Sequence, residues 1–134
     1  MSVEPRQALY AHLRADPGVQ AAVGDRVYQR RVPTGAMKPL IVIWPPISRV
    51  PVRDLAEVAW QRTRIQLTAI ADTQSDVEVA AKAAINAVEG FSGLMAGALE
   101  VMEARVQGDR QVDQDEVDEV YHHIDVIITY FDKE

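Results

Sequence analysis

The chain has 134 residues, of which 48% are apolar and 25% charged, the size and composition of one ordinary globular domain. It contains no cysteine, which excludes a disulfide scaffold, a cysteine-ligated zinc site, an iron–sulfur cluster and a thiol nucleophile. No apolar run approaches the roughly 20 residues that span a bilayer, and residues 1–6 lack a signal core, so we expect neither a membrane partner nor export by that route.

The N-terminal segment predicts a helix over residues 4–15. Pro5 suits a first helical position, and Leu9 and Leu13 are spaced to lie on one face. Asp16 can cap a second, short helical turn that follows directly.

Two strands are predicted next, a short one at 26–32 and a central one at 40–44, the latter rich in β-branched residues and bounded by prolines. The proline-bearing segment 45–59 is interpreted as a long loop or protruding arm, with Val50 and Val52 in an extended pattern around Pro51.

A strand over 60–71 follows, with apolar and polar residues alternating between its two faces. The clearest helix is 76–88, where Ser75 and Glu78 form a capping-box pattern. Its apolar residues have the spacing of one buried stripe, and we expect that stripe to pack on the sheet: Val77, Ala80, Ala81, Ala84, Ile85 and Val88.

The C-terminal part predicts a loop at 91–97, a strand at 98–107, a turn at 108–109, a solvated acidic loop at 111–119 and a last strand at 120–131. The whole chain, 1–134, is therefore predicted to be one α+β domain. It would have a largely antiparallel sheet of about five strands, an N-terminal helix and one long covering helix.

Known catalytic motifs are missing: the sequence has no phosphate-binding loop, dinucleotide fingerprint, nucleophile elbow or zinc-protease pattern. His122, His123 and Asp125 are metal-capable, but neighbours on a strand point to opposite faces, so the three cannot share a site without a bulge. The acidic cluster lacks the glycine and terminal glutamate of a calcium loop. We therefore expect no metal, no cofactor and no enzymatic activity.

Charge is divided unevenly along the chain. Residues 1–67 carry 10 Lys/Arg and 5 Asp/Glu (net +5), residues 68–134 carry 4 and 15 (net −11), and the sum is the net charge of −6. Faces of opposite sign would suit stacking against a neighbour, although folding can also interleave the two halves in space. A nucleic-acid-binding or ligand-binding α+β domain is the alternative, but the arginines are not interleaved with aromatic residues.

The order of the motifs resembles the tail completion proteins of long-tailed bacteriophages, which are related to tail terminator and head–tail joining proteins. The resemblance lies in "ALYAHLRADPGVQAAVGDRVYQRRVP", "KPLIVIWPPIS", "LAEVAWQRTRIQLTAIADTQSDVEVAAKAAINAVEG" and the closing "VYHHIDVIITYF". It covers the chain from about Pro5 to Phe131.

This resemblance implies a structural virion protein that forms a ring, commonly of six subunits, at the head-proximal end of the tail tube. The ring would complete the tube, meet the tail tube protein and the head connector or closure protein, and let DNA pass through its lumen without base contacts. The expected locations are the virion and, during assembly, the host cytoplasm.

The candidate interface combines the tryptophans that bracket the arm, apolar and basic residues on or beside it, and the acidic loop. Trp44 and Trp60 either pack at the base of the arm or are ordinary core or rim tryptophans. We expect the two charged groups to serve different surfaces. The interface residues are Trp44, Val50, Val52, Arg53, Leu55, Trp60, Arg62, Arg64, Asp113, Asp115, Asp118 and Glu119.

Overall fold

The computed structural model describes residues 4–52, 60–114 and 119–131. In these ranges the helices are α1 (Pro5–Ala15), α2 (Pro17–Val23) and α3 (Gln74–Val88). The strands are β1 (Val27–Gln29), β2 (Leu40–Ile43), β3 (Ser48–Val52), β4 (Trp60–Ala71), β5 (Gly93–Met95), β6 (Leu99–Gln114) and β7 (Glu119–Phe131).

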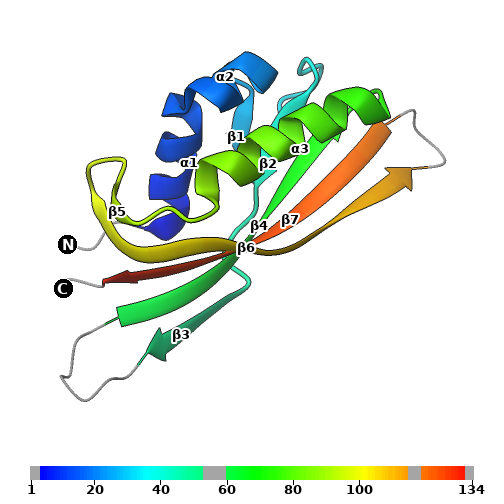
Figure 1. Ribbon diagram of the computed structural model, residues 1–134. Helices are drawn as coiled ribbons and strands as arrows, with labels where there is room; N and C mark the ends of the chain where they lie inside the picture. Colours follow the sequence, from blue (N-terminus) through cyan, green and yellow to red (C-terminus); the bar gives the residue numbers. More distant parts are fainter. Residues whose placement is uncertain (1–3, 53–59, 115–118, 132–134) are drawn as a thin grey trace.

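The strands form one sheet in the order β1-β2-β4-β7-β6-β5. Strand β3 is not part of this order and pairs with β4. β1 runs parallel to β2, and the other pairs are antiparallel. All three helices lie on one side of this sheet (Figure 1). β3 and the adjoining half of β4 project beyond the helices, and so does the β6–β7 end at the opposite corner (Figure 1).

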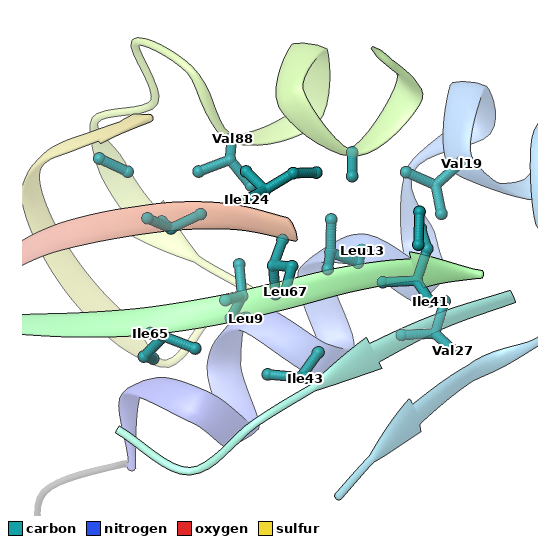
Figure 2. Close-up of a cluster of buried hydrophobic side chains, with 14 of the residues drawn as sticks. Leu9, Leu13, Val19, Val27, Ile41, Ile43, Ile65, Leu67, Val88 and Ile124 are labelled. Carbon is teal, nitrogen blue, oxygen red and sulfur yellow. The ribbon is translucent and has the colours of Figure 1, made fainter. Parts of the chain in front are cut away.

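The core fills the space between the helices and the sheet. Leu9 and Leu13 of α1 meet Ile65 and Leu67 of β4 and Ile124 of β7 there, and all five side chains are fully buried (Figure 2). Burying side chains of this size stabilises the fold by about 1.5–3 kcal/mol each.

Helix α3 lies on β4 and β7 through small residues. Val77, Ala80, Ala81, Ala84 and Val88 are buried, as its apolar stripe predicted. Alanines on this face let the helix backbone approach the sheet closely. Ile85 is an exception, because it is only partly buried at the margin of the core.

The cap of α3 also differs from the prediction. The Thr73 side chain accepts a hydrogen bond from the Asp76 backbone N–H at 3.1 Å, so Thr73 is the N-cap and the helix begins before the predicted Ser75 box. The prediction for α2 is confirmed, because the Asp16 carboxylate caps it by accepting from the Val19 N–H at 3.0 Å.

The α+β class is confirmed, but the sheet is mixed rather than largely antiparallel, and seven strands are described instead of about five. The parallel β1–β2 pair makes the sheet mixed, because residues 30–39 carry the chain back to the start of β2. The first part of the predicted arm is strand β3, and the predicted loop at 91–97 contains β5.

The predicted acidic loop is shorter than expected, because β6 continues to Gln114 through the predicted turn at 108–109. Register shifts beside Val101 and Val106 mark irregularities where β6 adjusts its pairing with β7. Pairing with β7 holds this hydrophilic half of β6 extended although no helix covers it (Figure 1).

Candidate functional site: the uncovered face of the sheet

The face of the sheet opposite the helices carries a row of polar side chains from β4 and β7. Along β4, Ile65 and Leu67 point into the core, so Arg64 and Gln66 point to the other face. Gln66 is opposite Asp125 of β7, which places that carboxylate on the same face. We call this surface the uncovered face.

A hollow of about 320 Å³ lies at the centre of the uncovered face. Its lining is mostly polar and comes from the 44–48 connection, β4, β6 and β7: Ile47, Arg64, Gln66, Gly108, Asp109, Arg110, His123 and Asp125.

One ion pair crosses the floor of the hollow. Arg64 Nη2 donates to Asp125 Oδ2 at 2.7 Å, with both side chains partly exposed. The buried Arg64 Nε and Asp125 Oδ1 have no partner among the described residues. The pair therefore uses part of the hydrogen-bonding capacity of each group.

Beside the hollow, a hydrogen-bonded chain fixes Trp44. Its Nε1–H donates to Thr68 Oγ1 at 2.8 Å, and Thr68 Oγ1 lies 2.9 Å from His123 Nδ1. The direction of the Thr68–His123 hydrogen bond follows the tautomer of the imidazole, because the hydroxyl can accept a second bond or donate its own proton. Burial, helped by the nearby Arg110 charge, lowers the pKa of His123 and so favours the neutral form of the ring.

Exposed apolar side chains border the polar hollow. Ile47 is 55% exposed and Val50 54%, while Trp44 is 37% exposed at the end of β2. Val50 is opposite Arg62 in the β3–β4 register, so it belongs to the same face as the arginines. Aromatic and arginine side chains beside apolar groups are the composition of protein–protein interfaces.

The structure brings together several of the predicted interface residues. Trp44, Val50, Trp60, Arg62 and Arg64 lie on strands of, or directly beside, the uncovered face, and Val52 pairs with Trp60 in the backbone register. The two tryptophans have different partners. Trp44 binds Thr68, whereas Trp60 packs edge-on against Phe131 with ring centroids 5.4 Å apart.

The acidic half of the predicted interface is only partly described. Arg53, Leu55, Asp115 and Asp118 lie outside the described residues, and Asp113 is placed only as the backbone partner of Val120. Glu119 is not a free acidic group. It forms an ion pair with Lys38 at 2.5 Å and accepts from the Tyr121 hydroxyl at 3.4 Å, and its hydrogen bond raises the pKa of Lys38.

The two adjacent histidines have different partners, as the strand alternation predicted. His123 bonds Thr68 on the uncovered face, whereas His122 Nε2 bonds Asp109 Oδ2 at 2.6 Å. Among the described residues no three His, Cys, Asp or Glu side chains gather as a possible metal site.

The arginines of the basic half do not form one patch. Arg49 is opposite Thr63, a residue of the core side of β4, and it pairs with Glu4 at 3.3 Å. Arg64 pairs with Asp125, and Arg26 donates through Nε to the Pro39 carbonyl. Sequence reasoning missed Ile47 and Arg110 and weighed His123 only as a metal ligand. The pairing of β6, β7 and β4 brings Arg110 and His123 to the hollow, whereas Ile47, an apolar residue after two prolines, carried a local signal.

Comparison with known proteins identifies the class. The chain matches the family "Tail completion protein gp17" over residues 7–131. The chain therefore belongs to this family and is a structural protein of the bacteriophage tail. Within the described residues, no helix is long and apolar enough to cross a membrane.

The fold is also found in a phage-like particle. A chain in the virion of a native gene transfer agent superposes with a TM-score of 0.80 at 19% identity, covering 95% of this chain and 94% of that one. A crystal structure from Akkermansia muciniphila gives a TM-score of only 0.37 at 12% identity, covering 69% of this chain and 42% of that chain. No curated protein matches the sequence.

Proposed function

We propose that this protein forms a ring, of six subunits in the virion, at the head-proximal end of the tail. The ring completes the tail tube and presents a surface to the head connector or closure protein. Membership of the tail completion family over residues 7–131 is the observation that carries this proposal. The fold shared with a chain of a gene transfer agent virion supports it.

The proposed partners follow from that position. The ring meets the tail tube protein on one side and the head connector on the other, and DNA passes through its lumen without base contacts. The protein is then found in the virion and, while tails assemble, in the host cytoplasm. Its role is structural, without catalysis.

The subunit contacts in this proposal use the uncovered face, strands β3 and β4, and the predicted interface residues Arg53 and Leu55, which lie outside the described residues. Val50 and Ile47 need cover from water, and an edge strand such as β3 can pair with another chain. The acidic segment with Asp113, Asp115 and Asp118 serves a second surface, toward a neighbouring ring.

Complementation of a phage that lacks the gene tests the proposal. Wild-type protein is expected to restore particles with joined heads and tails, and its absence to give separate heads and tails of abnormal length. A matched pair of variants then tests the surface: Val50→Asp on the uncovered face against Val79→Asp on the exposed side of α3, two positions of nearly equal exposure. Normal particles without the gene would refute the function.

The hollow supports one other candidate function, because Arg64, His123 and Asp125 converge there as in a small ligand site. A nucleic-acid-binding role is the related alternative. Titration with a DNA duplex over a salt series, together with thermal-shift screening of small carboxylates and phosphates, distinguishes both from assembly. The alternative would be favoured if the wild-type protein binds one of these ligands tightly and a variant that has lost this binding still forms normal tails.

A further inference from the structure

The edge of the sheet at β1 is closed by hydrogen bonds within the chain. The bonds that pair β1 with β2 leave the backbone groups of Val27 and Gln29 facing outward. The Val27 N–H donates to the Asp25 carbonyl at 2.9 Å. The Gln29 carbonyl accepts from the Arg31 N–H at 2.7 Å. These local bonds leave little of this edge for another strand.

The opposite edge is also closed along β5 and the first half of β6. Ala104 exchanges backbone hydrogen bonds with residues 90–91, and the Val106 N–H donates to the Glu89 carboxylate at 2.7 Å. β5 is three residues long, so only Leu94 turns its backbone groups outward. This part of the edge therefore offers another chain almost no backbone group.

The second half of β6 has an open edge. Successive residues of a strand turn their backbone groups to alternate sides. The Gln66 carbonyl faces β2, because it accepts from the Trp44 N–H, and counting across β7 places the backbone groups of Arg110 and Val112 toward β7. The outward-facing residues are Asp109, Gln111 and Asp113. Within the described parts of the chain, nothing bonds their backbone groups on that side.

β3 has the other open edge. Val50 is opposite Arg62, which faces β3 by the same alternation, so Arg49 and Pro51 turn their backbone groups outward. Pro51 has no N–H, and a proline at such a position is typical of edge strands. Two β3 strands paired with each other would lack this donor on both copies. The β3 edge therefore suits a partner that differs from itself.

The β6 edge also pairs poorly with its own counterpart. A register centred on Gln111 would place Asp109 opposite Asp113, and one centred on Arg110 would place two arginines opposite each other. A register centred on Val112 leaves Asp109 without a partner, because β6 ends before the residue that would face it. Like charges on facing strands are destabilising, so this edge too favours a different partner.

The directions of the strands allow the two open edges to meet. β3, β4, β7 and β6 are successive antiparallel neighbours, so β3 and β6 run in opposite directions. The β6 edge of one copy can therefore pair antiparallel with β3 of a second copy that keeps the same strand direction. The two edges lie at opposite corners, where the sheet projects beyond the helices, so the helices do not obstruct the approach (Figure 1).

We propose that the open edge of β6 in one copy pairs with β3 of the next copy, so that the sheet continues from subunit to subunit. The register places Val50 opposite Val112, two apolar residues on the uncovered face, and the Gln111 N–H donates to the Pro51 carbonyl. The two edges differ, so the contact is head-to-tail and can close into a ring. This inference rests on the proposed ring and adds the strands that join its subunits.

Site-directed cross-linking tests this pairing, because the chain has no cysteine of its own. Tails are assembled from a mixture of two chains, one with Val50→Cys and one with Val112→Cys. The mixed disulfide should form at least tenfold faster than in a control mixture of Val50→Cys and Glu103→Cys. Glu103 is exposed on the same strand and face as Val112, but it lies in the half of β6 whose edge is closed.

A proline substitution provides the second arm. The Gln111 N–H faces outward, so Gln111→Pro removes no backbone bond within the subunit, and Gln111→Ala is the control that keeps the donor. Placed in the Val112→Cys chain, Gln111→Pro should leave the melting temperature close to that of the control and slow the mixed disulfide at least tenfold. Equal disulfide rates for the two variants, or a Gln111→Pro chain that does not fold, would overturn the pairing.

The outcomes separate this pairing from the proposed function. A mixed disulfide no faster than the Glu103 control in tails that join heads normally would overturn the pairing and leave the function standing. Val50 or Val112 self-disulfides in excess would do the same, because they indicate pairing of like edges. A fast mixed disulfide in a protein that never associates with tails would support the pairing and overturn the function.

Discussion

Substituting Ala84 by Asp tests the packing of α3 on the sheet. Ala84 is fully buried in the apolar core between α3 and the sheet, and no basic side chain belongs to that cluster. A carboxyl group there must either be desolvated as an ion or remain protonated. Raising its pKa by about 3 units from the usual 3.9, so that about half of the carboxyl groups are protonated near pH 7, costs about 4 kcal/mol. This is a large part of the roughly 5–15 kcal/mol that stabilises a domain.

Urea unfolding between pH 4.5 and 7 measures this cost. Because the pKa of the new carboxyl is raised in the folded state, the folded protein binds more protons than the unfolded chain. The stability deficit should therefore shrink as the pH falls, by about 1.4 kcal/mol per unit. Ala84→Asn is the control for size and polarity and should show no such dependence, and exposed Val79→Asp should cost no more than about 0.5 kcal/mol. A pH-independent deficit, or one below 1 kcal/mol, would refute the assignment of this face.

Three further predictions concern the uncovered face and its surroundings. Arg110→Gln should raise the pKa of His123, followed by NMR titration, because the arginine charge contributes to lowering it; an unchanged titration would show that Arg110 does not act on the ring. Because the pKa of His123 is lowered in the folded state, the stability that the neutral ring contributes is present above about pH 6.5 and is lost as the pH falls. Acid unfolding curves of His123→Gln should lack this loss of stability. Reversing Asp113, Asp115 and Asp118 to Lys should leave the melting temperature nearly unchanged but weaken assembly, most strongly at low salt. Adding Glu119→Lys should also lower the melting temperature, because it breaks the ion pair with Lys38. Equal assembly of the variant and the wild type across a salt series would show that the acidic segment is only a solvated surface.

The elements with one buried face could be predicted from the sequence. The stripe of α3 and the alternation in β4 and β7 reflect contact with a single core, so periodicity alone located them. The N-terminal helices were equally clear, because Pro5 and Asp16 mark their starts.

The elements without a buried face could not be predicted from the sequence. β3 contains Pro51 and is held by its pairing with β4, and the second half of β6 is hydrophilic because it projects beyond the helices. Both segments therefore have the composition of loops. The parallel β1–β2 pair makes the sheet mixed. It depends on how the connection between the two strands runs through space, which no local sequence pattern predicts.

The candidate site shows the same division. Val50, Arg62 and Arg64 were identified from their own segments and do share the uncovered face. Arg110 and His123 joined them only through the register of β6 on β7 and of β7 on β4. The Glu119–Lys38 pair likewise joins residues far apart in sequence, so its effect on the acidic group could not be foreseen.

Electron cryomicroscopy of intact particles tests the central claim most directly. Particles should be prepared with the wild-type chain and with a chain carrying a small fused tag. The account predicts a ring of this protein at the end of the tail tube that joins the head, with the additional tag density at that ring alone. Tag density at the distal end of the tail, along its length, or absent from particles that have joined their heads would contradict it.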